Sequence, residues 1–252
     1  MLAPQRQSAI LDRVRRAGGV RVSELVGEFG VSDMTIRRDL EVLADRGLVR
    51  KVHGGATVLG PGATEEPGFA AKSARQQSEK AAIAARAAAL VEPGTAIALS
   101  AGTTTAALAA HLVDIAGLTV VTNSIPVAET LRGSEATVVL TGGIRTPSDA
   151  LAGPVAVAAI GGLHVDVLFL GVHGMSDRAG FTTPNLMEAE TNRALVAAAR
   201  RTVVLADHTK WQTVGLATIA RLDEADTLVS DEGLPPDARA VLAELVGELI
   251  LA

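Results

Sequence analysis

The sequence predicts an α/β protein in which a small helical unit precedes a larger unit built on a mostly parallel sheet. Helical patterns and a Gly-Gly turn fill residues 1–57, and the Gly- and Pro-rich stretch VLGPGATEEPG follows them. From residue 95 onward, short apolar segments alternate with helical ones. That alternation is typical of a parallel sheet covered by helices on both faces. We therefore expect domains over 1–57 and 73–252, joined by a linker over 58–72.

The first domain is expected to begin with three helices around one core. Apolar residues at helical spacing predict the first over residues 4–17, with Arg6 among its exposed arginines. Ser23 is suited to begin the second and Gly30 to end it, because serine caps helix N-termini and glycine tolerates the left-handed conformation that follows a helix. By the same reasoning, Ser32 begins the third helix.

After Gly47, which is expected to end the third helix, apolar and polar residues alternate and then turn at Gly54-Gly55. This pattern predicts a short two-stranded wing. Helices followed by a wing form the outline of a winged helix-turn-helix, which binds DNA with its recognition helix in the major groove.

The residues on the expected recognition helix and wing have the chemistry that DNA contacts need. Arginine is the common bidentate partner of guanine, and threonine can bond a phosphate or touch a thymine methyl group. Cations on the wing are placed to hold backbone phosphates, which set affinity and register but not sequence. The alternative is a helical hairpin whose two arginines are solvated and pair with Asp39 or Glu41. The residues predicted to contact double-stranded DNA are Ser32, Asp33, Met34, Thr35, Arg37, Arg38, Arg50, Lys51 and His53.

The charge distribution also favours a nucleic-acid partner for the first domain. Residues 1–56 carry ten Lys or Arg and seven Asp or Glu, a net charge of +3, whereas the remainder carries thirteen and twenty-one, a net charge of −8. A basic module joined to an acidic body is expected of a DNA-binding module attached to a separate domain. An aromatic content of 2% with no tyrosine disfavours single-stranded nucleic acid, which is held by stacking on aromatic rings.

Composition disfavours several other classes of protein. The chain has no cysteine, which excludes disulfides and thiolate chemistry, and its five histidines show no metal-ligand spacing. No uncharged apolar run reaches the length that spans a membrane, and the N-terminal residues lack the apolar core of a signal peptide. We therefore expect a soluble cytoplasmic protein with no metal or other cofactor.

The stretch VSDMTIRRDLEVLADRGLVRKVHGGA, residues 31–56, resembles the helix-turn-helix and wing of the DeoR family of bacterial sugar-metabolism repressors. The TIRRDL sequence and the spacing from it to HGGA carry the likeness. The resemblance implies that the second domain senses a phosphorylated sugar.

The second domain is expected to open with an alanine-rich helix over 73–90, which Pro93-Gly94 stops. Apolar runs then predict strands over 96–99, 119–122, 137–140, 165–170, 202–206 and 227–229. Helices are expected over 104–113, 125–131, 155–161, 188–200 and 236–245. In such sheets ligands lie beyond the carboxyl ends of the strands.

The loop after the first of these strands, Ser100 to Thr105, is the best candidate for a ligand site. Gly102 permits close approach of the backbone, the following helix offers free N–H groups, and three threonines add hydroxyls. Together these groups suit a phosphate. The alternative is an ordinary Ser/Thr helix cap. Taken singly, the strand ends at Thr122-Asn123-Ser124, Thr141-Gly142-Gly143 and Gly171 to Gly174 are better explained by turns than by a site. In the strand end Asp207 to Lys210, Lys210 is explained equally well by a site and by a solvated surface lysine. Together these strand ends suggest a site.

The segments SAGTTT, VTNS, TGG, GVHG, GFTTPNLMEAE and ADHTKW extend the resemblance to the DeoR-family effector domain, which is similar in fold to ribose-5-phosphate isomerase and glucosamine-6-phosphate deaminase. Ser100-Ala101 stands where the family usually has Asp-Ser, and His173 stands where Asn or Asp is common. A packing role is the alternative for His173. The resemblance implies a phosphate at Gly102, Thr103, Thr104 and Thr105 and a sugar near Asn123, Gly142, Gly143, Glu188 and Lys210, with Ser100 and His173 as further effector-binding candidates.

These observations predict a transcriptional repressor, not an enzyme. Its partners are expected to be operator DNA, a phosphorylated sugar and further copies of the chain in a homodimer or homotetramer, since operators are bound by paired recognition helices. The alternative is a phosphosugar isomerase or deaminase with an accessory DNA-binding head, for which Asp166, Glu188, Asp207 and Lys210 are the candidate groups. A purely architectural DNA binder leaves the convergent loops unexplained.

Overall fold

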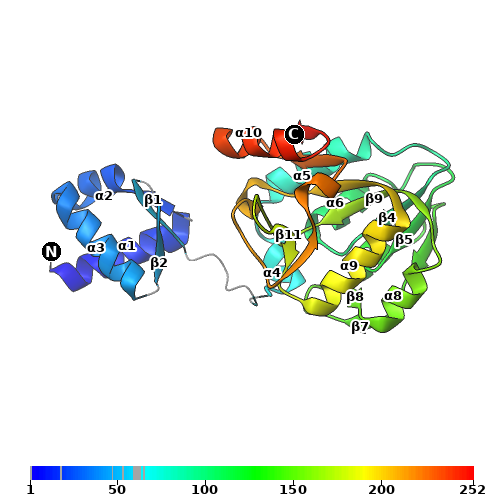
Figure 1. The fold of residues 1–252 in the computed structure, drawn as a ribbon, viewed down its shortest axis with the longest axis horizontal. Helices are drawn as coiled ribbons and strands as arrows, with labels where there is room; N and C mark the ends of the chain where they lie inside the picture. Colours follow the sequence, from blue (N-terminus) through cyan, green and yellow to red (C-terminus); the bar gives the residue numbers. More distant parts are fainter. Residues whose placement is uncertain (1, 18, 47, 53, 59–63, 65) are drawn as a thin grey trace. The chain divides into compact units, whose positions relative to one another are not determined.

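The protein is described by a computed structural model that covers residues 2–17, 19–46, 48–52, 54–58, 64 and 66–252. Its contacts divide the chain into two compact units, Met1–Gly62 and Ala63–Ala252. The ribbon in Figure 1 follows the chain through both units. The predicted class is confirmed, because a helix-turn-helix unit precedes an α/β unit with a large parallel sheet.

The small unit packs three helices against a three-stranded antiparallel sheet. Its core is formed by apolar side chains from all three helices, among them Ile10, Leu25 and Ile36, which are fully buried. The expected two-stranded wing gains a third strand, because residues 19–21 pair with its second strand. The elements are α1 (Ala3–Ala17), β1 (Gly19–Arg21), α2 (Val22–Phe29), α3 (Asp33–Asp45), β2 (Val49–Val52) and β3 (Gly55–Val58), with the strands in the order β1-β3-β2.

This third strand explains why the wing turns at two glycines. Gly54 has φ of +79°, a conformation that side chains disfavour. A Cβ atom at Gly55 would lie 2.1 Å from the carbonyl oxygen of Val20 in β1, so only glycine permits that approach.

Two of the predicted helix caps are confirmed and one is wrong. Gly30 adopts φ of +61° and its N–H donates to the Val26 carbonyl, and the Ser32 hydroxyl accepts from the Thr35 N–H at 3.3 Å. Ser23 does not begin α2. The helix starts one residue earlier, where the Glu24 carboxylate accepts the Arg21 N–H. Gly47 lies outside the described residues.

A buried ion pair joins α1 to α3. The expectation that Arg6 is exposed is wrong: its side chain is buried, and its Nε lies 2.5 Å from Oδ2 of Asp39. Gln7 Nε2 donates to the other carboxylate oxygen at 2.9 Å. A carboxylate buried on a helix is costly unless it is paired, so α1 supplies the partners that α3 requires.

The large unit is built on a seven-stranded sheet in which every described pairing is parallel, as the alternating apolar runs predict. All six predicted strands are present, and residues 249–251 add a seventh at one edge. In their hydrogen-bonded order the strands are β15 (Leu249–Leu251), β14 (Thr227–Ser230), β12 (Ala199–Leu205), β9 (Val165–Gly171), β4 (Ala96–Leu99), β5 (Thr119–Thr122) and β6 (Thr137–Leu140).

Both faces of this sheet are covered (Figure 1). Successive residues of a strand alternate between the faces, so Phe169 packs with α5, α6 and α7 while Leu168 packs with α8, α9, α10 and a small sheet. No helix among the described residues is long and apolar enough to cross a membrane. The covering elements are α5 (Gln77–Ala88), α6 (Thr103–Ala110), α7 (Ile125–Thr130), α8 (Pro154–Ile160), α9 (Leu186–Ala198), α10 (Pro236–Leu245) and the antiparallel strands β10 (Gly174–Ser176), β11 (Gly180–Thr183) and β13 (Ala217–Ala220).

The single helix predicted over 73–90 is two helices, α4 (Phe69–Ser73) and α5. The break lies at Gln76, whose φ of +48° is incompatible with a continuous helix. Lys80 stabilises this break, because its ammonium group donates to the carbonyls of Lys72 and Arg75 at 2.5 and 2.6 Å. A two-stranded ribbon, β7 (Ile144–Arg145) and β8 (Leu151–Ala152), was also not predicted.

The strand order places a reversal of the chain at the centre of the sheet. From β4 the chain continues through β5 to β6 on one side, and then returns to β9 on the other side of β4. The connections after β4 and β9 therefore leave in opposite directions and open a crevice at their carboxyl ends, where α/β proteins bind ligands.

Replacement of Asp39 by Ala is expected to destabilise the small unit by about 3 kcal/mol, because it leaves the Arg6 guanidinium buried without its partner. Hydrogen exchange of the α1 and α3 amides measures this loss. Arg13→Ala is the matched control, since Arg13 and Glu28 form an exposed pair at 3.6 Å and such pairs contribute less than about 1 kcal/mol. Equal exchange in the two variants would contradict the importance of the buried pair.

Candidate functional site

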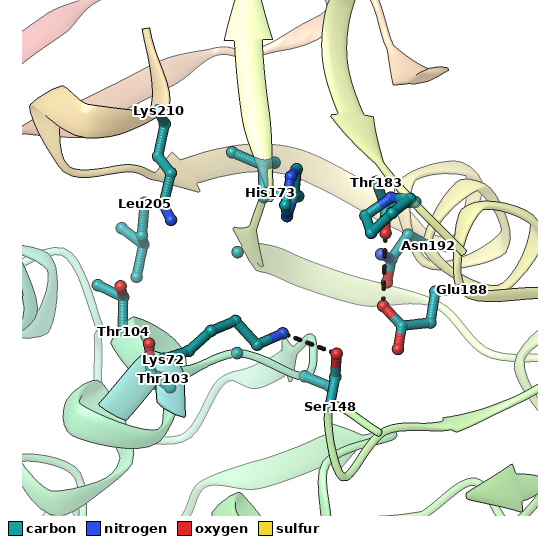
Figure 2. A pocket seen from close by; sticks show the side chains of 15 residues that line it. Lys72, Thr103, Thr104, Ser148, His173, Thr183, Glu188, Asn192, Leu205 and Lys210 are labelled. Atoms are coloured by element: carbon teal, nitrogen blue, oxygen red, sulfur yellow. Dashed lines mark hydrogen bonds between the residues drawn. The ribbon is translucent and has the colours of Figure 1, made fainter. Parts of the chain in front are cut away.

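A pocket lies at the predicted place, beyond the carboxyl ends of β4 and β9 (Figure 2). Six of the predicted effector-binding residues line it: Gly102, Thr103, Thr104, His173, Glu188 and Lys210. Ala101, Gly171 and Val172 also line it and belong to loops that the sequence analysis named as candidates. The lining residues that it did not single out are Lys72, Ser148, Thr183, Pro184, Asn192 and Leu205.

One side of the pocket is suited to an anion. The helix α6 begins there, and Gly102 precedes it without a capping hydrogen bond from any side chain in the described residues. The N–H groups of its first turn and the hydroxyls of Thr103 and Thr104 therefore lie at the positive end of the helix dipole, which favours a negatively charged ligand. In Figure 2, Lys210 descends toward the same side of the pocket, and Lys72 extends across its floor.

Lys72 is the most important residue that the sequence analysis missed. It lies on α4, at the end of the stretch predicted as linker, and its ammonium group donates to the Ser148 hydroxyl at 2.7 Å. Burial lowers the pKa of Lys72, while the nearby Glu188 and Glu66 favour its charged form. The alanine-rich pattern that begins near Phe69 predicts a helix, but it does not indicate that α4 folds back onto the sheet.

The opposite side of the pocket is formed by α9. Glu188 is in its first turn, where the Asn185 side chain caps the helix by accepting the N–H groups of Met187 and Glu188. The hydroxyls of Thr146 and Thr183 donate to its carboxylate at 2.5 and 3.4 Å. Burial raises the pKa of Glu188. This side offers hydrogen-bonding groups, which suits the hydroxyls of a sugar.

Two buried polar atoms on the pocket wall have no hydrogen-bond partner among the described residues. They are Nε2 of His173 and Oδ1 of Asn192. Buried polar atoms are nearly always paired, so an unpaired atom in a pocket indicates a place for a ligand atom or a water. Burial, with the positive charges of Lys210 and Lys72, lowers the pKa of His173 to about 4. His173 is therefore neutral near pH 7, able to hydrogen-bond but not to supply charge.

Three predicted site residues lie behind the pocket and position its backbone. The Ser100 hydroxyl accepts the Gly171 N–H at 2.9 Å, which joins the ends of β4 and β9. The Thr105 hydroxyl donates to the Ser100 carbonyl at 2.7 Å, and the Asn123 side-chain oxygen accepts the Ala101 N–H at 2.9 Å. These three side chains are buried and are not among the pocket-lining residues.

The predicted pair Gly142 and Gly143 is also absent from the pocket lining. Both have positive φ, +72° and +125°. A Cβ atom on Gly143 would lie 2.7 Å from the Ala152 carbonyl oxygen, so this glycine permits close contact with β8.

The candidate DNA-binding residues gather at the start of α3 and on β2, as predicted, with His53 outside the described residues. Arg37 is engaged by Asp33 on the same helix, and Lys51 lies 3.2 Å from Glu41. Arg38 and Arg50 are exposed and have no ion-pair partner among the described residues. The remaining members of the set are the Ser32 and Thr35 hydroxyls, 2.9 Å apart, and Met34, a residue that is 75% exposed.

Of the four groups proposed for an enzyme, Glu188 and Lys210 line the pocket, whereas Asp166 and Asp207 do not. Asp166 accepts the Ala96 N–H at 2.9 Å, at the start of β4 and thus at the opposite end of the sheet from the pocket. Asp207 is buried, and one of its oxygens accepts from Thr209. Within the described part of the chain, no three His, Asp or Glu side chains are grouped as a metal ion requires.

Comparison with known families finds two matching models that together cover most of the chain. Residues 6–61 match the DeoR-like helix-turn-helix domain, and residues 75–232 match the DeoR C terminal sensor domain. The chain is 37% identical over 255 residues to the uncharacterized HTH-type transcriptional regulator YgbI of Escherichia coli K12. That alignment covers 100% of this chain and 99% of the relative. It is 33% identical to a putative aga operon transcriptional repressor of Escherichia coli O157:H7, covering 98% and 93%.

Among solved structures, ribose 5-phosphate isomerase A from Methanocaldococcus jannaschii is a distant neighbour. It is 17% identical with a TM-score of 0.41, and the alignment covers 54% of this chain and 55% of that one.

Replacement of His173 by Asn tests the effect of burial on the pKa of His173. As the pH falls through 6.5 the unfolded chain protonates this histidine, whereas the folded protein does so only near 4, so wild-type stability is lost over that interval. Between about pH 7.5 and about pH 5, the wild-type Tm is expected to fall by roughly 2–4 °C more than that of the variant, after allowance for partial solvent exposure. Parallel Tm curves would contradict the lowered pKa.

Proposed function

The chain belongs to the DeoR family of transcriptional regulators, and from this membership we propose that it is a repressor controlled by a phosphorylated sugar. The small unit binds operator DNA through α3 and the wing. The large unit binds the effector in the pocket at the ends of β4 and β9. We propose the functional division at the predicted boundaries, with DNA binding in residues 1–57 and sensing and oligomerisation in 73–252, to which Lys72 adds a pocket contact.

The observation that carries the effector proposal is the division of one pocket into two chemically different sides. Lys72, Lys210 and the start of α6 suit the phosphate group. Glu188, Asn192 and His173 suit the sugar hydroxyls, because each offers a hydrogen-bonding group on the pocket wall. Two of these groups, on His173 and Asn192, have a buried atom without a partner among the described residues. A phosphorylated sugar has this same combination of one dianionic end and one hydroxylated end.

The proposed role is regulation and not catalysis. Isomerisation of a phosphosugar needs a carboxylate base and an electrophilic partner beside the carbonyl. Glu188 is held by hydroxyl donors on both of its oxygens, and Asp166 lies at the other end of the sheet. A bound sugar is therefore expected to remain unchanged, which incubation with pentose and hexose phosphates would show directly.

The DNA-binding proposal assigns different roles to the exposed cations. Arg38 on α3 is free to contact a base, and the exposed Met34 side chain is suited to a thymine methyl group. Arg50 on the wing is suited to a backbone phosphate. Arg37 and Lys51 must exchange their acidic partners for DNA. Because each chain supplies one recognition helix, we propose a homodimer or homotetramer in the cytoplasm.

The repressor proposal is tested with DNA fragments that the full-length protein selects from a random library. Affinity for a selected fragment is measured with and without pentose and hexose phosphates. Weaker DNA binding in the presence of at least one sugar phosphate supports the proposal, since a ligand shifts the protein only if it prefers one state. Unchanged DNA affinity across the whole panel would overturn it.

Replacement of Lys72 by Met keeps the length of the side chain but removes its charge. Affinity for inorganic phosphate is expected to fall by about 10- to 100-fold, the loss that follows from one charge-assisted hydrogen bond of about 1.5–3 kcal/mol. Isothermal titration calorimetry measures the change. Arg132→Met is the control, since Arg132 is an exposed cation paired with Glu129 and lies outside the pocket lining. Equal affinities of the two variants would contradict the assignment of Lys72.

Replacement of Arg38 or Arg50 by Ala separates base contacts from phosphate contacts. Arg38→Ala is expected to cost about 1–3 kcal/mol on the selected DNA and to relax the sequence preference. Arg50→Ala is expected to weaken selected and random DNA alike and to reduce the salt dependence of binding by about one counterion. Fluorescence anisotropy over a range of salt concentrations distinguishes the two. The interpretation fails if both variants lose affinity in the same way.

A further inference from the structure

The segment Glu66–Ser73 belongs to the N-terminal end of the large unit, which follows the small unit along the chain. It is the first part of the unit Ala63–Ala252 that has described contacts, and it contains α4. Its N-terminal half is held against the β7–β8 ribbon and α9. The Phe69 N–H donates to the Pro147 carbonyl at 3.0 Å.

Glu66 makes two hydrogen bonds that anchor this segment. Its Oε1 accepts the Ser148 hydroxyl at 2.9 Å, and its Oε2 accepts the Asn185 side-chain NH₂ at 3.0 Å. Asn185 also caps α9, the helix that carries Glu188 and Asn192. The anchor therefore holds residues that line the pocket or fix its walls, although Glu66 itself is not a lining residue.

Ser148 connects this anchor to the pocket. Its hydroxyl accepts from the Lys72 ammonium group at 2.7 Å, an interaction drawn in Figure 2, and donates its one proton to Glu66. The three groups thus form a chain in which a cation orients a hydroxyl toward a carboxylate. A change in the position of Lys72 alters the bond that Ser148 makes to Glu66.

The pKa values of the two carboxylates near Lys72, Glu66 and Glu188, are shifted in opposite directions. Burial opposes ionisation of Glu66, but hydrogen bonds from Asn185 and Ser148, with the interactions of Glu188 and Lys72, outweigh it and lower the pKa of Glu66. Burial raises the pKa of Glu188. The lowered pKa leaves Glu66 ionised near pH 7, and its carboxylate accepts from Ser148, which lines the pocket.

We propose that Glu66 is a latch that an anionic ligand opens. A phosphate at the start of α6 attracts the Lys72 ammonium group away from Ser148, and the Ser148–Glu66 bond loses the cation that orients it. The segment Glu66–Ser73, which leads to the DNA-binding unit, is then released from the ribbon and from α9. This inference rests on the proposed function, since it requires an anion in the pocket.

The mechanism distinguishes an anionic ligand from a neutral sugar. Only an anion competes with Ser148 for Lys72, because a lysine ammonium group interacts much more strongly with a phosphate than with a hydroxyl. A neutral sugar that occupies the hydroxyl side of the pocket leaves the Lys72–Ser148 interaction in place, so the latch responds to the phosphorylated form alone.

The test is hydrogen exchange of the full-length protein, followed by mass spectrometry on peptides that contain residues 66–73. Saturating inorganic phosphate is expected to speed exchange of this segment by about 10-fold relative to chloride at equal ionic strength, because exchange reports local opening. Glu66→Gln, which lacks the charge, is expected to exchange this fast without phosphate and to gain nothing when phosphate is added. Glu129→Gln, which removes an exposed carboxylate paired with Arg132, is expected to behave like the wild type.

Binding of phosphate and of hexose and pentose phosphates is measured in parallel by calorimetry, so that the two proposals fail separately. If none of them binds, the proposed function and the latch are both overturned. If phosphate binds and exchange of residues 66–73 stays constant or slows, the latch is overturned and the effector site stands. A Glu66→Gln variant as protected as the wild type also overturns the latch. Exchange of the β9 amides, which must stay slow, shows that the variant remains folded.

Discussion

The hydrogen bond from the Gly171 N–H to the Ser100 hydroxyl is the interaction on which the ligand site depends. It joins the carboxyl ends of β4 and β9 at 2.9 Å, where the chain reverses its direction across the sheet. The Ser100 N–H bonds to Phe169 on the same strand, and the Thr105 hydroxyl bonds to the Ser100 carbonyl. These bonds hold the start of α6 in place, and its backbone N–H groups give one side of the pocket a partial positive charge.

Electrostatics divide this pocket into two chemically different sides. Burial lowers the pKa of Lys72 and His173 and raises the pKa of Glu188. At Glu66, hydrogen bonds reverse the effect of burial. As a result, the ionised Glu66 carboxylate lies outside the pocket lining and the neutral His173 lies on the pocket wall. Lys72 and Lys210 lie near the N-terminus of α6. This distribution suits the two ends of the phosphorylated sugar that we propose as the effector.

The small unit follows a different constraint, which is the position of its recognition helix. Asp39 holds α3 against α1 through Arg6 and Gln7, so the exposed first turns of α3 have a rigid support. Close approach of β1 to Gly55 gives the wing a third strand. A helix that binds DNA from its N-terminal turns benefits from such support, since a misplaced helix loses its base contacts.

Local patterns in the sequence determined the elements and the family. Gly30 and Ser32 act within one turn of the chain, so their caps were predictable, and the apolar runs of the large unit were predictable because each is a continuous buried strand. The six pocket residues that were predicted follow strands or begin helices, so each one is recognisable from its immediate neighbours. Tertiary structure alone decided the Arg6–Asp39 pair, the third strand of the wing and the pocket role of Lys72. Each of these joins residues distant along the chain, and sequence periodicity carries no information about such partners.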